Sequence, residues 1–211
     1  VTLRNTTDRP RRITVTHFIE WVLGSSRSAA QQQVVTRYDA AAEMLTAHNW
    51  FNVDFPGRPA FLACDRPLHS WTASRTEFVG RNGRPADPAA MHRASLGGES
   101  GRFHDNCGAL MVELELAPSG EADATFLLGQ APTLDRAREL VAAYRGPAEA
   151  ASELARTRAR WEALLSQVQV STPEPALDLM LNRWLLYQVV ACRILGRTAA
   201  YQSSGAFGFR D

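Results

Sequence analysis

The fold class is decided by the stretch Gln130-Ala-Pro-Thr-Leu-Asp-Arg-Ala-Arg-Glu-Leu-Val-Ala-Ala-Tyr144, because the spacing of apolar residues changes within it. After Pro132 the apolar residues recur at helical spacing, which predicts a helix over 134–144. Thr133 is a suitable N-cap, and Gly146-Pro147 ends the helix. Before residue 131 the spacing is mostly two, the period of a strand with one buried face. The sequence therefore predicts a β domain followed by helices.

Several short segments before residue 131 are rich in β-branched and aromatic residues and predict strands. These segments are 12–22, 60–64, 70–78, 109–116 and 122–128. The last two flank the turn signal Pro118-Ser-Gly120, so we expect them to pair as a hairpin. Short strands at this spacing predict a β-sandwich. Segment 39–49 is ambiguous between helix and strand, and 79–106 is predicted to be one long irregular loop.

Two more helices are predicted after Gly146, over 147–166 and 173–195. Thr172-Pro173-Glu174 is a good helix start, with a hydroxyl cap, a proline in the first turn and an acid near the positive end of the dipole. One broad face of the last helix is apolar, and such a face is expected to be buried in a larger helical assembly. Its members are Leu177, Met180, Leu181, Trp184, Leu185, Gln188 and Cys192.

Composition excludes several classes of function. The formal net charge is +1, so no strong field draws the chain to nucleic acid. All 23 basic residues are arginines, which excludes lysine-nucleophile chemistry. The three cysteines are far apart and the five histidines lack metal-ligand spacing, so we expect no disulfide framework, no metal and no cofactor. No apolar run is long enough to span a membrane.

The glycine-rich and aromatic segment 201–211 is the first candidate binding site. Asp211 can accept hydrogen bonds from two vicinal hydroxyl groups, and Arg210 can donate to the same sugar edge. Gln202 and Phe209 lie in the same segment, where glycines let a ligand approach and an aromatic ring can stack on it. The alternative is a salt bridge at a helix end next to a glycine-rich turn.

A second candidate site lies within 71–83, which suits a polyhydroxylated ligand or a domain interface. Its polar members are Arg75, Glu77, Arg81 and Asn82. The alternative is an ordinary strand end in which Arg75 and Glu77 pair on one face of a sheet.

A series of motifs, taken in order, resembles the glycoside hydrolase family 94 phosphorylases. The motifs are Phe51-Asn-x-Asp-Phe-x-Gly-Arg58, Ser70-Trp-Thr-x-x-Arg-Thr-Glu-Phe-x-Gly-Arg-Asn-Gly83, Phe126-Leu-Leu-Gly-Gln130, Met180-Leu-Asn-x-Trp-Leu-Leu-Tyr-Gln188 and the closing Gly-Phe-Arg-Asp211. The resemblance covers essentially the whole chain. Within the family, the chain is most similar to the phosphorylase-type C-terminal domain of cyclic β-1,2-glucan synthases.

The resemblance implies a mixed β and α fold in three parts. These parts are a β-sandwich over 1–131, a helical linker over 132–170 and, over 171–211, the first helix of a truncated (α/α)6 catalytic barrel. It also implies inverting phosphorolysis of a β-glucan oligosaccharide, with inorganic phosphate as co-substrate and glucose 1-phosphate as product. An inverting hydrolase of the same clan would need a second carboxylate to activate water.

Site roles follow from the same resemblance. Asp211, with Arg210 beside it, would bind the hydroxyl groups of the non-reducing glucose. The general-acid Asp of the family is expected in a Trp-Asn-Asp motif beyond residue 211, so no residue here is assigned as catalytic and the chain alone is expected to be inactive. Cellobiose and chitobiose phosphorylases usually carry an Arg six residues before that Asp. Gly205 stands there in this chain, which favours the glucan-synthase branch.

The implied partners are the rest of the catalytic barrel and a second copy of the chain, in a bacterial protein on the cytoplasmic side of the membrane. A membrane anchor in other segments of the parent protein stays open. Since the chain starts at Val1 and stops inside segment 201–211, it is expected to be a fragment. The alternative function is a non-catalytic carbohydrate-binding or scaffold β-sandwich.

Overall fold

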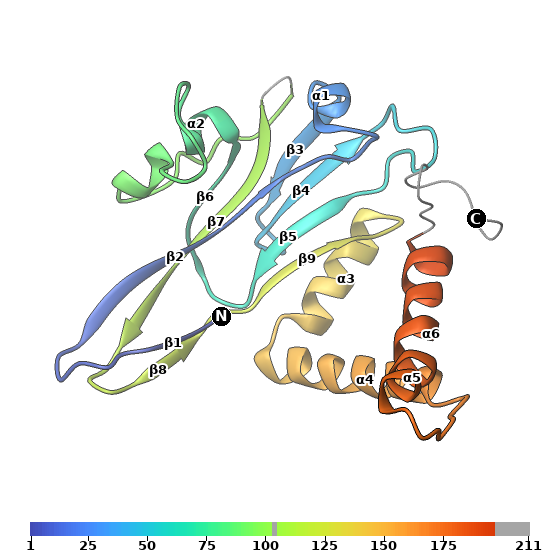
Figure 1. Ribbon diagram of the computed structural model, residues 1–211. Helices are drawn as coiled ribbons and strands as arrows, with labels where there is room; N and C mark the ends of the chain where they lie inside the picture. Colours follow the sequence, from blue (N-terminus) through green and yellow to red (C-terminus); the bar gives the residue numbers. More distant parts are fainter. Residues whose placement is uncertain (103–104, 197–211) are drawn as a thin grey trace. The chain divides into compact units, whose positions relative to one another are not determined.

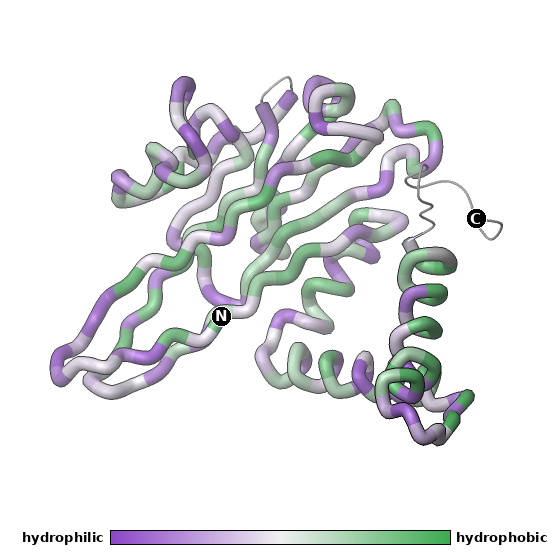
Figure 2. The backbone as a smooth tube through the Cα atoms, in the orientation of Figure 1, coloured by the Kyte–Doolittle hydropathy of each residue, from purple (hydrophilic) through white to green (hydrophobic). Residues whose placement is uncertain are grey.

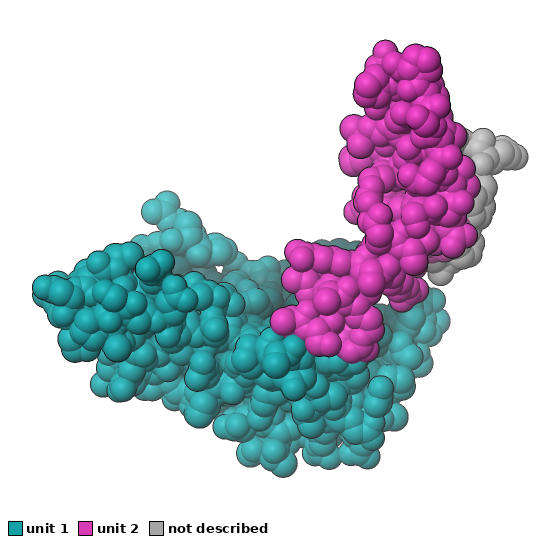
Figure 3. All heavy atoms as spheres, turned by 90° about the horizontal axis from the view of Figure 1, so that it is seen from below, with its two compact units in different colours: residues 1–150 teal, residues 151–211 magenta. Residues whose placement is uncertain are grey.

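The computed structural model describes residues 1–102 and 105–196 (Figure 1). The chain divides into two compact units, Val1–Ala150 and Ala151–Asp211, which Figure 3 colours separately. All strands among the described residues lie in unit 1. They are β1 (Thr2–Arg4), β2 (Arg11–Glu20), β3 (Val34–Asp39), β4 (Met44–Asn49), β5 (Ala60–Cys64), β6 (Leu68–Ser74), β7 (Asn106–Leu116), β8 (Glu121–Asp123) and β9 (Phe126–Gln130).

The strands form antiparallel sheets with the orders β2-β7-β6 and β3-β4-β5-β9, and β1 pairs with β8. Short helices interrupt the strands, and longer ones follow them. They are α1 (Arg27–Ala30), α2 (Arg75–Val79), η1 (Ala89–His92), α3 (Leu134–Tyr144) and α4 (Pro147–Leu165), then α5 (Pro175–Leu179), η2 (Met180–Trp184), α6 (Leu185–Gln188) and η3 (Val189–Leu195). The predicted mixed β and α class is confirmed.

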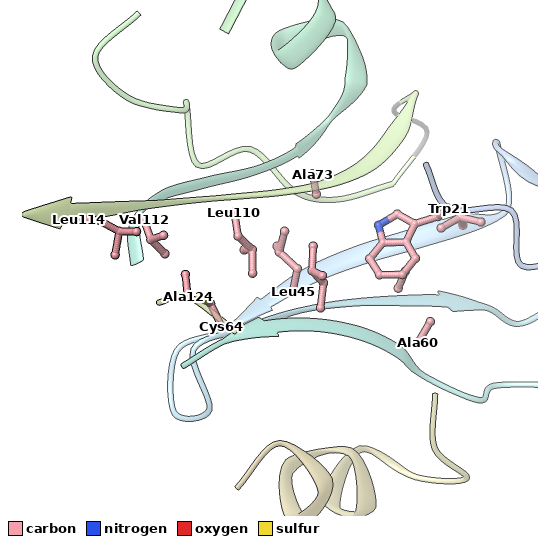
Figure 4. Close-up of a cluster of buried hydrophobic side chains, with 12 residues drawn as sticks. Trp21, Leu45, Ala60, Cys64, Ala73, Leu110, Val112, Leu114 and Ala124 are labelled. Carbon is pink, nitrogen blue, oxygen red and sulfur yellow. The ribbon is translucent and has the colours of Figure 1, made fainter. Parts of the chain in front are cut away.

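The main core lies between the three-stranded and the four-stranded sheet, as expected for a β-sandwich. Figure 4 shows Leu110 of β7 and Leu45 of β4 among the side chains that fill this layer. Trp21 closes one end of the core and donates from Nε1 to the backbone carbonyl of Cys107 at 2.7 Å. Gly108 lets the indole approach, because a Cβ atom there would lie 2.9 Å from the Trp21 ring.

Each of the two larger sheets is also covered on its outer face, the three-stranded sheet by α2 and the four-stranded sheet in part by α3. On the three-stranded sheet, Phe78 and Val79 of α2 pack with Met111 of β7, and Phe18 stacks on Phe78 with centroids 4.5 Å apart. On the four-stranded sheet, α3 packs against part of the outer face through a cluster that includes Phe61. Strand β7 is therefore buried on both faces from Asn106 to Val112, which explains its continuous apolar run.

The predicted hairpin of 109–116 with 122–128 is wrong. Strand β7 has no free edge, because β2 pairs with it over ten residues on one side and β6 pairs with it on the other. The chain after the turn at 117–120 divides instead between two sheets. Strand β8 pairs with β1. Strand β9 pairs with β5 in the four-stranded sheet, which lies opposite the sheet that contains β7.

The predicted strand 70–78 is also partly wrong, since the strand ends at Ser74 and α2 begins at Arg75. The Ser74 hydroxyl caps this helix by accepting a hydrogen bond from the backbone N–H of Glu77 at 3.2 Å. The ambiguous segment 39–49 contains strand β4 after a turn. The described residues of loop 79–106, which are 79–102, 105 and 106, are irregular as predicted, apart from the end of α2, η1 and the first residue of β7. The strands β1 and β3 and the helix α1 were not predicted.

The helices after residue 131 follow their local signals. Helix α3 has the predicted bounds, and the Thr133 hydroxyl accepts from the backbone N–H of Arg136 at 3.2 Å. Helix α4 ends one residue before the predicted limit.

The last predicted helix is present from residue 175 to 195, but two of its parts, η2 and η3, are π-helical. Its predicted cap is wrong. The carboxylate of Glu174 accepts from the N–H of Ala176, whereas the Thr172 hydroxyl donates to Asp178 at 2.8 Å. Long hydrophobic stretches mark this helix in Figure 2. Within the described chain its apolar side chains stay exposed, with Trp184 at 52%.

We expect Leu62→Ala to lower the free energy of unfolding by about 2–5 kcal/mol, because Leu62 is fully buried in the main core. Leu128 is its cross-strand neighbour on β9 but is 59% exposed. Leu128→Ala should therefore change stability by less than about 1 kcal/mol. Urea denaturation followed by circular dichroism measures both. Equal losses would contradict this location of the core.

Candidate functional site

Four of the predicted contact residues, Gln202, Phe209, Arg210 and Asp211, lie outside the residues that the structure describes. The other four, Arg75, Glu77, Arg81 and Asn82, lie in unit 1 in and after helix α2.

Arg75 is held by two carboxylates from distant parts of the chain. Its Nε donates to Glu20 at 2.5 Å, and its Nη1 donates to Asp105 at 3.4 Å. Donation to Glu20 is the main reason that the pKa of the guanidinium is raised. Its backbone N–H also donates to the carbonyl of Asp105 at 2.6 Å. Arg75 thus links the start of α2 to the segment before β7 through an ion pair and a backbone hydrogen bond to Asp105.

Arg27 contacts the same two acids and completes an ion-pair ring, defined as Glu20, Arg27, Arg75 and Asp105. Its Nε donates to the second oxygen of Glu20 at 3.0 Å, and its Nη2 contacts Asp105. The four charges cancel, and each side chain is between about a fifth and a third exposed. The ring joins the end of β2, helix α1, helix α2 and the residue before β7.

Glu77 faces a different set of partners. One of its oxygens pairs with Arg93 at 2.5 Å and accepts from the N–H of Gly97 at 3.2 Å. The side chain is only 8% exposed, and its other oxygen is buried without a hydrogen bond within the described part of the chain. The alternative in which Arg75 pairs with Glu77 is therefore wrong. Arg81 and Asn82 follow the helix as exposed residues, so these four side chains do not converge on one point.

Two of the sequence motifs do come together. Arg58, from the motif 51–58, donates to the side-chain oxygen of Gln130, from the motif 126–130, at 3.2 Å. The same guanidinium lies 6.0 Å from the ring centroid of Phe55. A cavity of about 280 Å³ opens here. Its lining residues are Leu23, Asn49, Phe55, Arg58, Ala60 and Gln130.

A larger open cavity of about 620 Å³ lies on the outer face of the four-stranded sheet, beside the start of α3. We call it the β3–β4 groove. Its polar and aromatic lining includes Arg37, Thr46, His48, Trp50, Thr133 and Arg138. None of these was predicted as a contact residue, although Trp50 directly precedes the motif 51–58. The outward positions of β3 and β4 become neighbours only through strand pairing, so no local signal could identify them.

No group of three or more His, Cys, Asp or Glu side chains suited to a metal ion occurs within residues 1–102 and 105–196. Cys64 and Cys107 are free and buried. Burial raises the pKa of the Cys64 thiol to about 11 and raises that of Cys107 as well. Neither thiol is therefore a thiolate nucleophile at neutral pH.

Two family models match the chain in succession. Residues 1–147 match the glycosyl hydrolase 94 supersandwich domain, which fits the observed β-sandwich. The chain belongs to the glycosyl hydrolase 94 family. Residues 160–211 match the catalytic domain of the glycosyl hydrolase 94 superfamily. The resemblance seen in the motifs is confirmed.

Three curated relatives align along the whole length of the glycosyl hydrolase 94 chain. The chain is 39% identical over 212 residues to the cyclic beta-(1,2)-glucan synthase NdvB of Rhizobium meliloti, of which it covers 8%. It is 26% identical to an N,N'-diacetylchitobiose phosphorylase of Vibrio proteolyticus and 28% identical to a solabiose phosphorylase of Paenibacillus borealis, and it covers 27% of each. The chain thus spans less than a third of these relatives.

Among the helices of the described residues, none has the length and apolar character needed to cross a bilayer.

We expect Arg75→Ala to lower the free energy of unfolding by about 1–3 kcal/mol, because Glu20 and Asp105 would lose a shared partner in a partly buried setting. The difference in the free energy of unfolding between Arg75→Ala and the unsubstituted chain should become smaller at high ionic strength, because salt screens the remaining charges. Arg81→Ala is the control, with an expected change within about 0.5 kcal/mol. Urea titrations at low and high salt measure both. An unaltered midpoint for Arg75→Ala would show that the ring adds no stability.

Proposed function

We propose that this chain forms the supersandwich and the first part of the catalytic domain of an inverting glycoside phosphorylase that acts on β-glucan. The observation that carries the proposal is the family match over both parts of the chain. The 39% identical relative is a cyclic beta-(1,2)-glucan synthase, which supports β-1,2-linked glucan as the substrate. Inorganic phosphate is the co-substrate, glucose 1-phosphate is the product, and no other cofactor is required.

In this proposal Asp211 and Arg210 bind the hydroxyl groups of the glucosyl unit whose bond is broken. A carboxylate accepts hydrogen bonds from hydroxyl groups, and a guanidinium donates to their oxygens. Gln202 and Phe209 contribute to the same pocket. Phosphate is already an anionic nucleophile, so the reaction needs one general acid but not the second carboxylate that activates water in inverting hydrolases. That acid is supplied by a part of the catalytic domain outside this chain.

The helix from residue 175 to 195 is, in this proposal, the first helix of an (α/α)6 barrel. Its exposed apolar side chains support the idea, because a helix that is apolar over a wide surface is normally buried. Leu179 and Leu195 are both more than 60% exposed, and an apolar hollow lies between Leu165 and Trp184. The other barrel helices are the expected cover. Dimerisation through the sandwich is part of the same proposal.

Asp211→Ala, made in a longer protein that contains the whole catalytic domain, should lower turnover at least about 100-fold. The reason is the loss of charge-assisted contacts to the sugar that strengthen in the transition state. Release of glucose 1-phosphate from β-1,2-glucan and phosphate is the assay.

The control is Asp8→Ala, an exposed acid in unit 1, which should keep full activity. Full turnover in Asp211→Ala would remove this residue from the site. Release of glucose without phosphate would indicate a hydrolase. If the longer protein bound glucan but released no product, the alternative of a non-catalytic binding or scaffold module would replace the proposal.

The 211-residue chain on its own should associate, because the last helix exposes its apolar face to water. Light scattering should detect dimers or larger species, and Trp184→Ser combined with Leu185→Ser should shift them toward monomer. Leu128→Ser removes an even more exposed leucine from unit 1 and should have little effect. If the unsubstituted 211-residue chain were monomeric, this would contradict the idea that other helices normally bury this apolar face.

A further inference from the structure

The β3–β4 groove lies where α3 leaves the four-stranded sheet uncovered. Along β3 and β4 alternate side chains point to opposite faces. Leu45 faces the sandwich core, Met44 packs in the cluster beneath α3, and Thr46 and His48 continue the same outer face. Arg37 of β3 is the cross-strand partner of Thr46, so it belongs to this face as well.

A tryptophan held in position forms one wall of the groove. The ring of Trp50 stacks on His48 with centroids 5.4 Å apart and an interplanar angle of 5°. Gly57 adopts a φ of +68°, and a Cβ atom there would lie 2.6 Å from the indole, so only glycine allows this close approach. Despite these two contacts, Trp50 is 62% exposed. The structure thus fixes a large aromatic surface and leaves it open to water.

The polar groups beside the indole suit an uncharged ligand with many hydroxyl groups. Burial, and then the charge of Arg37, lower the pKa of His48, so the imidazole is neutral at pH 7 and offers one donor and one acceptor. Arg37 is exposed and has no ion pair with any described residue, which leaves its donors available. Arg138 is already paired with Asp39 at 2.8 Å and with Asp135 at 3.0 Å.

This set of groups matches a pyranose ring better than an anion. A pyranose has an apolar C–H face that packs on an aromatic surface, while its hydroxyl groups both donate and accept. A phosphate group in the groove would have the Arg37 guanidinium as a partner, because Arg138 is already paired. The apolar indole ring of Trp50 would add little to its binding. The cavity of about 620 Å³ lies within the range of small-ligand sites.

We propose that the β3–β4 groove is a second binding site for β-glucan, in which a glucosyl unit packs on Trp50 while Arg37 and His48 hydrogen-bond to its hydroxyl groups. The identity of the sugar rests on the proposed function. The site itself involves none of the residues predicted to contact substrate. Its role is to hold a part of the glucan chain on unit 1.

The test measures binding of linear β-1,2-gluco-oligosaccharides to the 211-residue chain by isothermal titration calorimetry. Trp50→Ala should weaken binding about tenfold, as expected for loss of an aromatic contact. Arg37→Gln, at an exposed position that does not threaten folding, should weaken it several-fold. Phe51→Ala is the matched control, because Phe51 is the next residue and is exposed but does not line the groove.

Asp211→Ala separates this inference from the proposed function. Unchanged oligosaccharide binding in Asp211→Ala, together with weaker binding in Trp50→Ala and Arg37→Gln, supports the groove. Loss of binding in Asp211→Ala alone overturns the groove and leaves the phosphorylase proposal standing. Equal weakening in Phe51→Ala and Trp50→Ala also overturns it. The effect would then come from the exposed loop in general and not from the Trp50 ring in the groove. Absence of any binding to the chain does the same.

Discussion

Unit 1 is organised around the need to cover strand β7 on both faces. From Asn106 to Val112 every residue of this strand is buried, and its two edges are taken by β2 and β6. One face requires the second sheet, which supplies the sandwich core. The other face requires the segment from α2 to Leu96, which packs Phe78 and Val79 against it. The long loop before β7 is therefore a covering layer of the sheet, although its sequence is rich in glycine, proline and charged residues.

The ion-pair ring explains how that covering layer is attached. Glu20 and Asp105 lie at the ends of the paired strands β2 and β7, and Arg75 begins α2 directly beside them. Such charges contribute modestly when exposed and more when partly buried with complete pairing. A motif that suggested sugar contacts thus contains at least one residue with a structural task. A direct role for Arg75 toward a sugar would require it to leave two carboxylates.

One end of the four-stranded sheet in unit 1 brings together residues that are suited to binding a ligand. The motif residues Arg58 and Gln130 meet at one end of the four-stranded sheet, and Trp50 lies at the same end of β4. This end combines exposed aromatic rings with polar side chains, the combination that a carbohydrate surface needs. In our proposal, the outer face of the sheet, where α3 does not reach, holds part of a glucan chain.

The sequence by itself determined the elements whose signals are local. Helix α3 has its predicted bounds, because Thr133 and the apolar spacing act within a few residues, and β5 was likewise predicted correctly. Only the tertiary structure decided which strands pair with β7 and which acids hold Arg75. The partners Glu20 and Asp105 lie 55 and 30 residues from Arg75, and β9 crosses to the other sheet. Strand pairing and ion pairing depend on which strand edges and sheet faces meet as the chain folds. No short stretch of sequence contains that information.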